Sequence, residues 1–89
     1  MVKGLYICDM KNQYNKEGYE EGLWEDYHSN GEVNSRRRYS DGVLNGLFEK
    51  FHDNGQLSIN GNFLDYKCVG IWFFYTPDGE LRMKKYYYI

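Results

Sequence analysis

Hydrophobic and polar positions recur along this chain with a period of 24 residues. Residues 22–45, 46–69 and 70–89 each open on a glycine, carry an aromatic residue at the third position, and continue through Asn-Gly or Asp-Gly to a late aromatic residue. A period of this size is typical of repeat proteins, in which each unit buries hydrophobic side chains against its neighbours. Tyrosine and other aromatic residues are abundant and alanine is absent, so the pattern predicts strands rather than helices.

Each unit contains two strand-like runs separated by a turn at residues 28–31, 52–55 or 76–79. The turns end on Gly31, Gly55 and Gly79, as a three-residue hairpin loop with a left-handed last residue requires. Further glycines link one hairpin to the next, with Tyr66 in place of the expected glycine before the third unit. We therefore predict an all-β fold: a single-layer antiparallel meander of stacked β-hairpins, forming a curled sheet.

The chain is expected to form one domain, residues 1–89, with three hairpin repeats at 22–45, 46–69 and 70–89. Residues 1–21 are expected to be a partial capping repeat, because residues 3–15 do not keep the register of the other units. Terminal units of repeat arrays are commonly atypical.

The hairpin turn predicts a strand register, and the register predicts two faces. If His28 opposes Glu32, then Asp26 opposes Asn34 and Trp24 opposes Arg36. One face is then expected to be apolar, with Leu23, Tyr27, Val33, Tyr39, Leu47, Phe51, Leu57, Ile59, Phe63, Ile71, Phe73, Tyr75, Leu81, Met83 and Tyr87. The other is expected to be half polar, with Trp24, Phe48 and Trp72 as a ladder beside Asp26, Arg36, Arg38, Lys50, Asn60, Asn62, Phe74, Arg82, Lys84 and Tyr86.

The opening Gly-x-aromatic, the Tyr-x-x-Asn-Gly-x-Leu step and the closing aromatic-x-x-Gly resemble MORN-type repeats, and most closely the bacterial variant described as antitoxin-like. The resemblance covers residues 18–89. It implies a curled single-layer sheet of stacked hairpins. It implies no single activity, because related arrays are linked to protein binding, membrane association and toxin neutralisation.

The overall charge and the cysteines narrow the function further. A formal net charge of −2 argues against a nucleic-acid binder. No apolar run suits a membrane helix or a signal peptide, so a soluble protein of the cytoplasm is expected. Cys8 and Cys68 lie about two repeats apart, roughly 20 Å in such a sheet, and are expected to be free thiols.

Two pairs of repeat-equivalent residues carry chemical groups but predict no catalytic or metal site. His28 and His52 are expected about 10 Å apart, too far to share one ion. The same spacing separates Glu25 from Glu49, with no nucleophile nearby, and Arg37 is the expected partner of Glu25. No enzyme activity, cofactor or metal is predicted.

Positions that differ between repeats are the ones we expect to serve function, since shared positions are explained by the fold. The residues predicted to bind a partner are Trp24, Arg36, Arg38, Phe48, Trp72, Phe74, Lys84 and Tyr86. Two alternatives stay open: the aromatic ladder is either an anchor for a partner or a cover for the linking glycines, and the arginines are either a basic patch or a solvated face.

The apolar face of a single-layer sheet lacks a covering layer. Strong coiling of the sheet, a second copy in a homodimer, or another protein would supply it. The leading hypothesis is a non-enzymatic module that occludes a partner protein, as an antitoxin or inhibitor does, with a virus-encoded inhibitor of host defence as one form. The alternative is a membrane- or lipid-associated structural repeat protein, against which the near-neutral charge and the acidic residues 17–26 argue.

Overall fold

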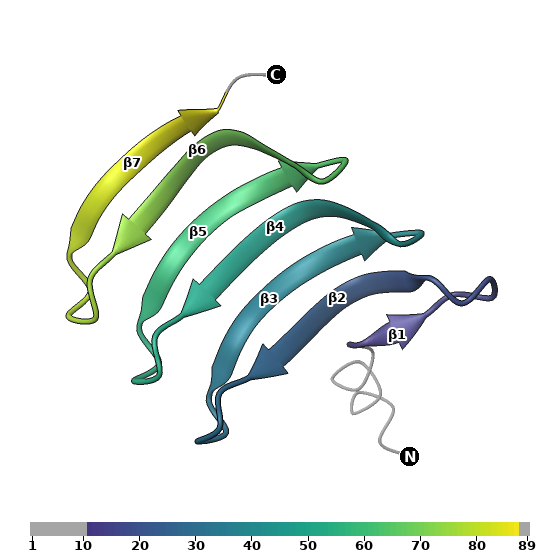
Figure 1. The fold of residues 1–89 in the computed structure, drawn as a ribbon, viewed down its shortest axis with the longest axis horizontal. Helices are drawn as coiled ribbons and strands as arrows, with labels where there is room; N and C mark the ends of the chain where they lie inside the picture. The colour runs from purple at the N-terminus through teal and green to yellow at the C-terminus, as the bar shows by residue number, and fades with distance from the viewer. Residues whose placement is uncertain (1–10, 88–89) are drawn as a thin grey trace, which may run out of the picture.

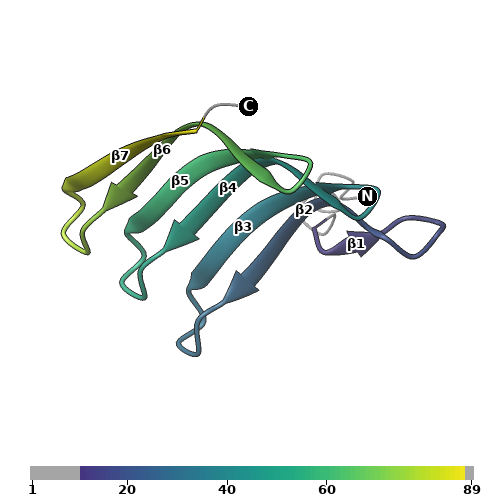
Figure 2. The same ribbon diagram turned by 45° about the horizontal axis from the view of Figure 1, so that its top comes forward.

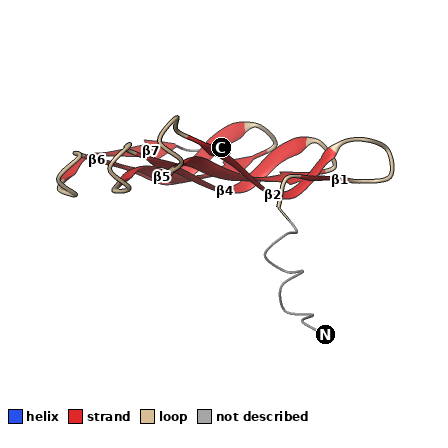
Figure 3. Ribbon diagram, turned by 90° about the horizontal axis from the view of Figure 1, so that it is seen from below, coloured by secondary structure: helices blue, strands red, loops and turns tan. Residues whose placement is uncertain are grey.

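A computed structural model describes residues 11–87 and arranges them as one antiparallel sheet (Figure 1). Its strands follow each other in chain order, so each pairs with the next along the sequence. The strands are β1 (Gln13–Tyr14), β2 (Glu20–Tyr27), β3 (Val33–Ser40), β4 (Val43–Phe51), β5 (Leu57–Leu64), β6 (Lys67–Tyr75) and β7 (Leu81–Tyr87). The described part of the chain contains no helix, and its strands form a single layer (Figure 3). The predicted all-β meander is confirmed.

The N-terminal strand is short and closes one edge of the sheet. β1 pairs with the start of β2, where Gln13 faces Glu21 and Tyr14 faces Glu20. The earlier part of the predicted capping segment, with Cys8, lies outside the described residues. Cys68 is a free thiol.

The hairpin turns form as predicted. Gly31, Gly55 and Gly79 have φ values of 91°, 90° and 91°, in the left-handed region that glycine adopts without a steric cost. In the first turn, the Gly31 amide donates to the His28 carbonyl at 3.0 Å and the His28 amide donates to the Glu32 carbonyl at 2.8 Å.

The predicted register beyond each turn is wrong by one residue. Tyr27 faces Val33 as predicted, but a β-bulge follows, so that Asp26 faces Ser35 and Trp24 faces Arg37. The second and third hairpins have the same shift, between Lys50 and Phe51 and between Phe74 and Tyr75. Because side chains alternate between the faces of a strand, a shift of one residue moves the rest of the second strand of each hairpin to the opposite face.

The shift brings six rings together on what we call the aromatic face, defined by Trp24, Tyr39, Phe48, Phe63, Trp72 and Tyr87. The prediction had placed three of these, Tyr39, Phe63 and Tyr87, on the other side. In the structure, Phe63 meets Trp72 edge to face with ring centroids 5.0 Å apart, and Tyr87 does so at 6.0 Å. These contacts form the packed centre of the sheet.

Trp72 is the buried hydrophobic residue at this centre, with 5% of its surface exposed. Phe48 stacks on it at 5.6 Å, and its indole nitrogen donates to the Asn62 and Val69 carbonyls, both at 3.2 Å. The fold therefore buries its largest ring without a second layer of secondary structure.

Strand curvature is the second feature that the turn alone does not predict. The ladder slips again at the opposite ends of the hairpins, between Arg37 and Tyr39 and between Asn60 and Asn62. Gly46 and Gly70, near these points, have φ values of 111° and 74°. Bulges and such glycines bend strands, and Figure 2 shows the strands of β2 to β7 curving in parallel arcs.

Neighbouring hairpins are joined at their turns by side chains that the repeats share. His28 Nε2 donates to the Phe51 carbonyl at 2.9 Å, and Asn30 donates to the Asp53 carbonyl at 2.9 Å. One repeat later, His52 and Asn54 make the same bonds to the Tyr75 and Pro77 carbonyls. The His-x-Asn-Gly turn thus links each hairpin to the next one.

Candidate functional site

The eight residues predicted to bind a partner do not share one face. Because of the register shift, they fall into two groups of four. Trp24, Phe48, Trp72 and Phe74 lie on the aromatic face, and Arg36, Arg38, Lys84 and Tyr86 lie on the opposite one, which we call the mixed face. The prediction that these eight residues lie on one surface is therefore wrong.

The predicted ladder of Trp24, Phe48 and Trp72 is a packing feature for most of its length. Phe48 and Trp72 stack, but Trp24 instead meets Tyr14 at 5.1 Å and Tyr39 at 6.1 Å. With Trp72 almost fully buried, the ladder offers little area to a partner.

The predicted basic patch does not form either. Arg36 lies on β3 and Lys84 lies on β7, four strand spacings away, which is roughly 19 Å. Arg36 is instead neutralised by carboxylates: its Nε lies 2.5 Å from Glu25 and its Nη1 lies 3.9 Å from Glu49. The expected partner of Glu25, Arg37, lies on the aromatic face and pairs with Asp26 at 3.3 Å.

A row of charges of alternating sign crosses the N-terminal half of the mixed face. It consists of Lys11, Glu25, Arg36 and Glu49. The Glu25 carboxylate is its centre, with 7% of the side chain exposed and with Lys11 Nζ at 2.9 Å. Burial would raise the pKa of Glu25, but hydrogen bonds from Lys11, Tyr27 and Arg36 lower it to about 2. Glu25 is thus a fixed anion, which suits it for orienting neighbours rather than for proton transfer.

The aromatic face holds a second ionic cluster near the first hairpin turn. Burial of Asp26 would raise its pKa, but hydrogen bonds from Ser35 and Arg37 and the charge of Arg37 lower it. Ser35 Oγ donates to Asp26 at 2.8 Å and accepts from Arg37 at 2.8 Å. The carboxylate, the hydroxyl and the guanidinium of this cluster are thus bonded to one another.

Three aliphatic residues at equivalent repeat positions form a stripe on the mixed face: Leu23, Leu47 and Ile71. Each follows one of the left-handed glycines that open the repeats. Leu47 is 36% exposed and Ile71 is 43% exposed. These positions are shared by all three units, yet the fold leaves Leu47 and Ile71 exposed, so burial does not explain why the units share them.

Further exposed hydrophobic side chains continue the mixed face toward the hairpin turns and the last strand. Tyr27 is 46% exposed, Leu81 is 48% exposed and Tyr86 is 53% exposed. The aliphatic stripe, the charge row and these residues cover one side of the sheet. A surface of this kind, apolar with fixed charges, is typical of protein interaction sites.

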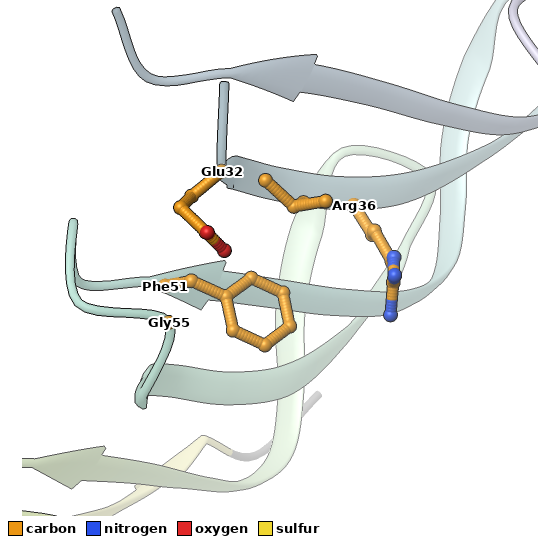
Figure 4. A pocket seen from close by; sticks show the side chains of 5 residues that line it. Glu32, Arg36, Phe51 and Gly55 are labelled. Atoms are coloured by element: carbon orange, nitrogen blue, oxygen red, sulfur yellow. The ribbon is translucent and has the colours of Figure 1, made fainter. Parts of the chain in front are cut away.

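A small hollow lies on the mixed face between the first two hairpins. Its volume is about 170 Å³, and it is lined by Glu32, Val33, Arg36, Phe51 and Gly55. Figure 4 shows the Glu32 carboxylate and the Arg36 guanidinium on opposite sides of the Phe51 ring. Binding sites for small molecules usually have volumes of about 300–1,000 Å³, so the size of this hollow suits one protruding side chain rather than a substrate.

The two histidines serve the turns rather than a metal. Each donates from Nε2 to a backbone carbonyl of the next hairpin. Residues 11–87 contain no cluster of three or more metal-ligating side chains.

Comparison with known families gives the class of the protein. The family model for the MORN repeat variant matches three segments, residues 20–41, 44–65 and 69–88, each one hairpin of the sheet. The chain belongs to the MORN repeat variant family. MORN repeats are non-enzymatic repeat modules that commonly mediate binding, to membranes or to other proteins.

Other comparisons add nothing to the family assignment. No curated protein and no solved structure matches this MORN protein. The described residues include no helix able to cross a membrane. The binding surface must therefore be argued from the chain's own residues.

Proposed function

We propose that this MORN protein is a non-enzymatic binding module that docks its mixed face onto another protein and occludes it, in the manner of an antitoxin or a small inhibitor. A virus-encoded inhibitor of a host defence protein is one form of this function, and the cytoplasm is the proposed location. The observation that carries the proposal is the exposure of Leu47 and Ile71, repeat-equivalent aliphatic residues on a sheet face that no second layer covers within residues 11–87.

The stripe supplies affinity because burying a large aliphatic side chain contributes roughly 1.5–3 kcal/mol, and less where the side chain is already half covered. The charge row determines the orientation in which a partner docks on the mixed face. Glu25 stays ionised and Arg36 bridges two carboxylates, so a partner must match a fixed alternation of charge. A partner surface with a row of aliphatic side chains beside polar groups fits the aliphatic stripe and the charge row.

The acidic residues of the mixed face favour a protein, rather than a lipid membrane, as the partner of this face. Glu25 and Glu49 lie in the centre of this face, between the stripe and the hairpin ends. Anionic lipid attracts basic surfaces and repels acidic ones. Co-sedimentation with anionic vesicles at low salt separates the two possibilities: the proposal predicts no pelleting, and saturable pelleting that Ile71→Asp abolishes would favour the membrane.

The test of the proposal is capture of partners from a lysate of the native host by the immobilised protein. Leu47→Asp and Ile71→Asp should each remove the partner, because a carboxylate would be buried in an apolar contact. Tyr14→Asp is the matched control, since Tyr14 is 63% exposed but lies beside Trp24 on the aromatic face. Retention of every partner by both stripe variants would contradict the proposal.

A second copy of the chain is the partner that is simplest to test. A homodimer through the mixed face would bring Glu25 and Arg36 of one chain near those of the other, where opposite charges can pair. Measurement of the mass in solution at high micromolar concentration decides it. If the protein is a dimer and Ile71→Asp makes it a monomer, the partner that the mixed face binds is a second copy of the chain. If the protein is a monomer, the homodimer is removed from the proposal.

A further inference from the structure

The last strand of the sheet, β7, is a long edge strand, whereas the edge at the other end is the two-residue strand β1. Strand order ends at β7, and Figure 1 shows no described strand beside it. At the other end, β1 pairs with β2, the Asn12 amide donates to the Leu23 carbonyl at 2.8 Å, and the Asn12 side chain accepts from the Glu25 amide at 2.7 Å. Alternate backbone groups of β7 therefore point outward without a strand partner among residues 11–87.

The third hairpin lacks the side chains that would join a fourth. His28 and His52 donate to the following turn, but the equivalent residue is Thr76, whose Oγ1 accepts from the Glu80 amide within its own turn. Asn30 and Asn54 also donate to the following turn, but the equivalent residue is Asp78, and a carboxylate has no proton to donate. The third turn therefore lacks the two donors that join each earlier turn to the next hairpin, so β7 is less suited to another MORN hairpin than β3 and β5 are.

The charge of β7 indicates the kind of strand it suits. Arg82, Lys84 and Lys85 lie within seven residues that contain no carboxylate. Within the described chain, none of the three forms an ion pair: Lys84 lies over the Phe73 ring and Lys85 over the Tyr87 ring. In contrast, Lys11, Arg36 and Arg37 each pair with a carboxylate.

Pairing of β7 with a second β7 is disfavoured by the same charges. In an antiparallel two-fold pair centred on the middle of the strand, Lys84 faces either Lys84 or Lys85 of the other copy. Like charges placed directly opposite each other destabilise a sheet. A second copy of this edge is therefore a poor occupant, and an acidic strand is a good one.

We propose that β7 binds an extended acidic segment of a partner protein, about seven residues long, as an eighth strand of the sheet. Backbone hydrogen bonds hold the segment, and its Asp or Glu side chains pair with Arg82, Lys84 and Lys85. The inference rests on the proposed function and names a second contact with the same partner. It involves the edge of the sheet, whereas the stripe of the proposed function lies on its face.

The test uses the whole protein, uniformly labelled with ¹⁵N, and a capped nine-residue peptide in which pairs of adjacent glutamates are separated by single valines. Both faces of such a strand carry carboxylates, as pairing with Lys84 and Lys85 requires. Peptide at saturation should slow amide exchange at alternate residues of β7 by about tenfold or more, because outward amides become hydrogen-bonded. The peptide with lysine in place of glutamate should have no effect. A version in which every backbone amide nitrogen of the peptide is methylated, which keeps the charge but has no N–H donor, should also leave exchange unchanged.

Charge reversal gives the second arm of the test. The double variant Lys84→Glu, Lys85→Glu should bind the acidic peptide at least about tenfold more weakly. The control is Lys16→Glu, Lys67→Glu, which changes the net charge by the same amount at two exposed lysines away from β7. Its affinity should stay within about twofold of the original.

Three results would overturn the inference: unchanged exchange in β7, equal protection by the N-methylated peptide, or a peptide-free protein already dimeric through β7. In the first two cases the lysines only guard the edge against pairing, and in the third a second copy of the chain occupies the edge. Loss of this edge site leaves capture through Leu47 and Ile71 intact, so the two proposals fail separately.

Discussion

The Trp72 ring lies directly over Gly61 on the neighbouring strand. A β-carbon at Gly61 would sit 2.1 Å from Cδ2 of the indole, much closer than atoms can approach. The absence of a side chain at Gly61 is what allows the largest buried ring of the sheet to lie flat between Phe48 and Phe63.

Gly61→Ala should therefore destabilise the protein by about 2–3 kcal/mol, because the ring must leave its contacts to make room. Urea denaturation followed by tryptophan fluorescence measures the change. Gly70→Ala is the control, since Gly70 has open space around it and a φ of 74°. Only the backbone cost of about 1 kcal/mol is expected there, and equal losses in the two variants would contradict the packing role of Gly61.

The ion pairs of Glu25 predict how stability depends on pH. The pKa of Glu25 falls from 4.5 in the unfolded chain to about 2 in the sheet. A carboxyl with a lowered pKa in the folded state contributes stability that is full above pH 4.5 and is lost as the pH falls toward 2. Denaturation at a series of pH values should show this decline, and Glu25→Gln should flatten it. A variant with an unchanged slope would show that other carboxyls cause the decline.

The bonds between successive turns predict that stability is transmitted from one hairpin to the next. His52→Ala and Asn54→Ala should each cost about 1 kcal/mol, because each leaves a carbonyl of the third turn without its donor. Asp78→Ala, at the position equivalent to Asn54 but with no following hairpin, should change stability by less than about 0.5 kcal/mol. Amide exchange in β6 and β7 should speed up in the first two variants and not in the third.

Tyr66 occupies a position where its backbone and its side chain act in opposite directions. Its φ of 70° is unfavourable for a residue with a side chain, while its hydroxyl donates to the Gly42 carbonyl of the preceding return turn. Tyr66→Phe should lose about 1 kcal/mol. Tyr66→Gly should be nearly neutral, because relief of the backbone offsets the lost bond. Equal destabilisation by both variants would show that the backbone is not strained here.

Sequence alone predicted the turns of the sheet because a turn depends on a few adjacent residues. The last residue of each turn is left-handed, and glycine at 31, 55 and 79 adopts that conformation without a steric cost wherever the rest of the chain lies. The faces depended on the bulge beside each turn, between residues 26 and 27 in the first hairpin, and nothing in the local sequence separates a bulged hairpin from a regular one. Because of this displacement of one residue, the partner of Glu25 is Arg36 and not the predicted Arg37.

The proposed binding surface was missed for a related reason. Leu47 and Ile71 were placed on the apolar face and assigned to folding, because every repeat has an aliphatic residue there. Burial in a single layer depends on neighbours across the strands, and at these positions the neighbours are Asn62 and Tyr86, which leave both side chains open. The repeat pattern identified the stripe but carried no information on its exposure.

Site-specific photo-crosslinking in cells of the native host tests the central claim, that the mixed face is the one that contacts the partner. A photoreactive phenylalanine analogue replaces Ile71 on the mixed face or, as the matched control, Tyr14 beside Trp24 on the aromatic face. Both positions are exposed, at 43% and 63%, and neither lies on the edge strand β7. The account predicts a discrete protein adduct from position 71 and none from position 14; an adduct from position 14 alone would contradict it.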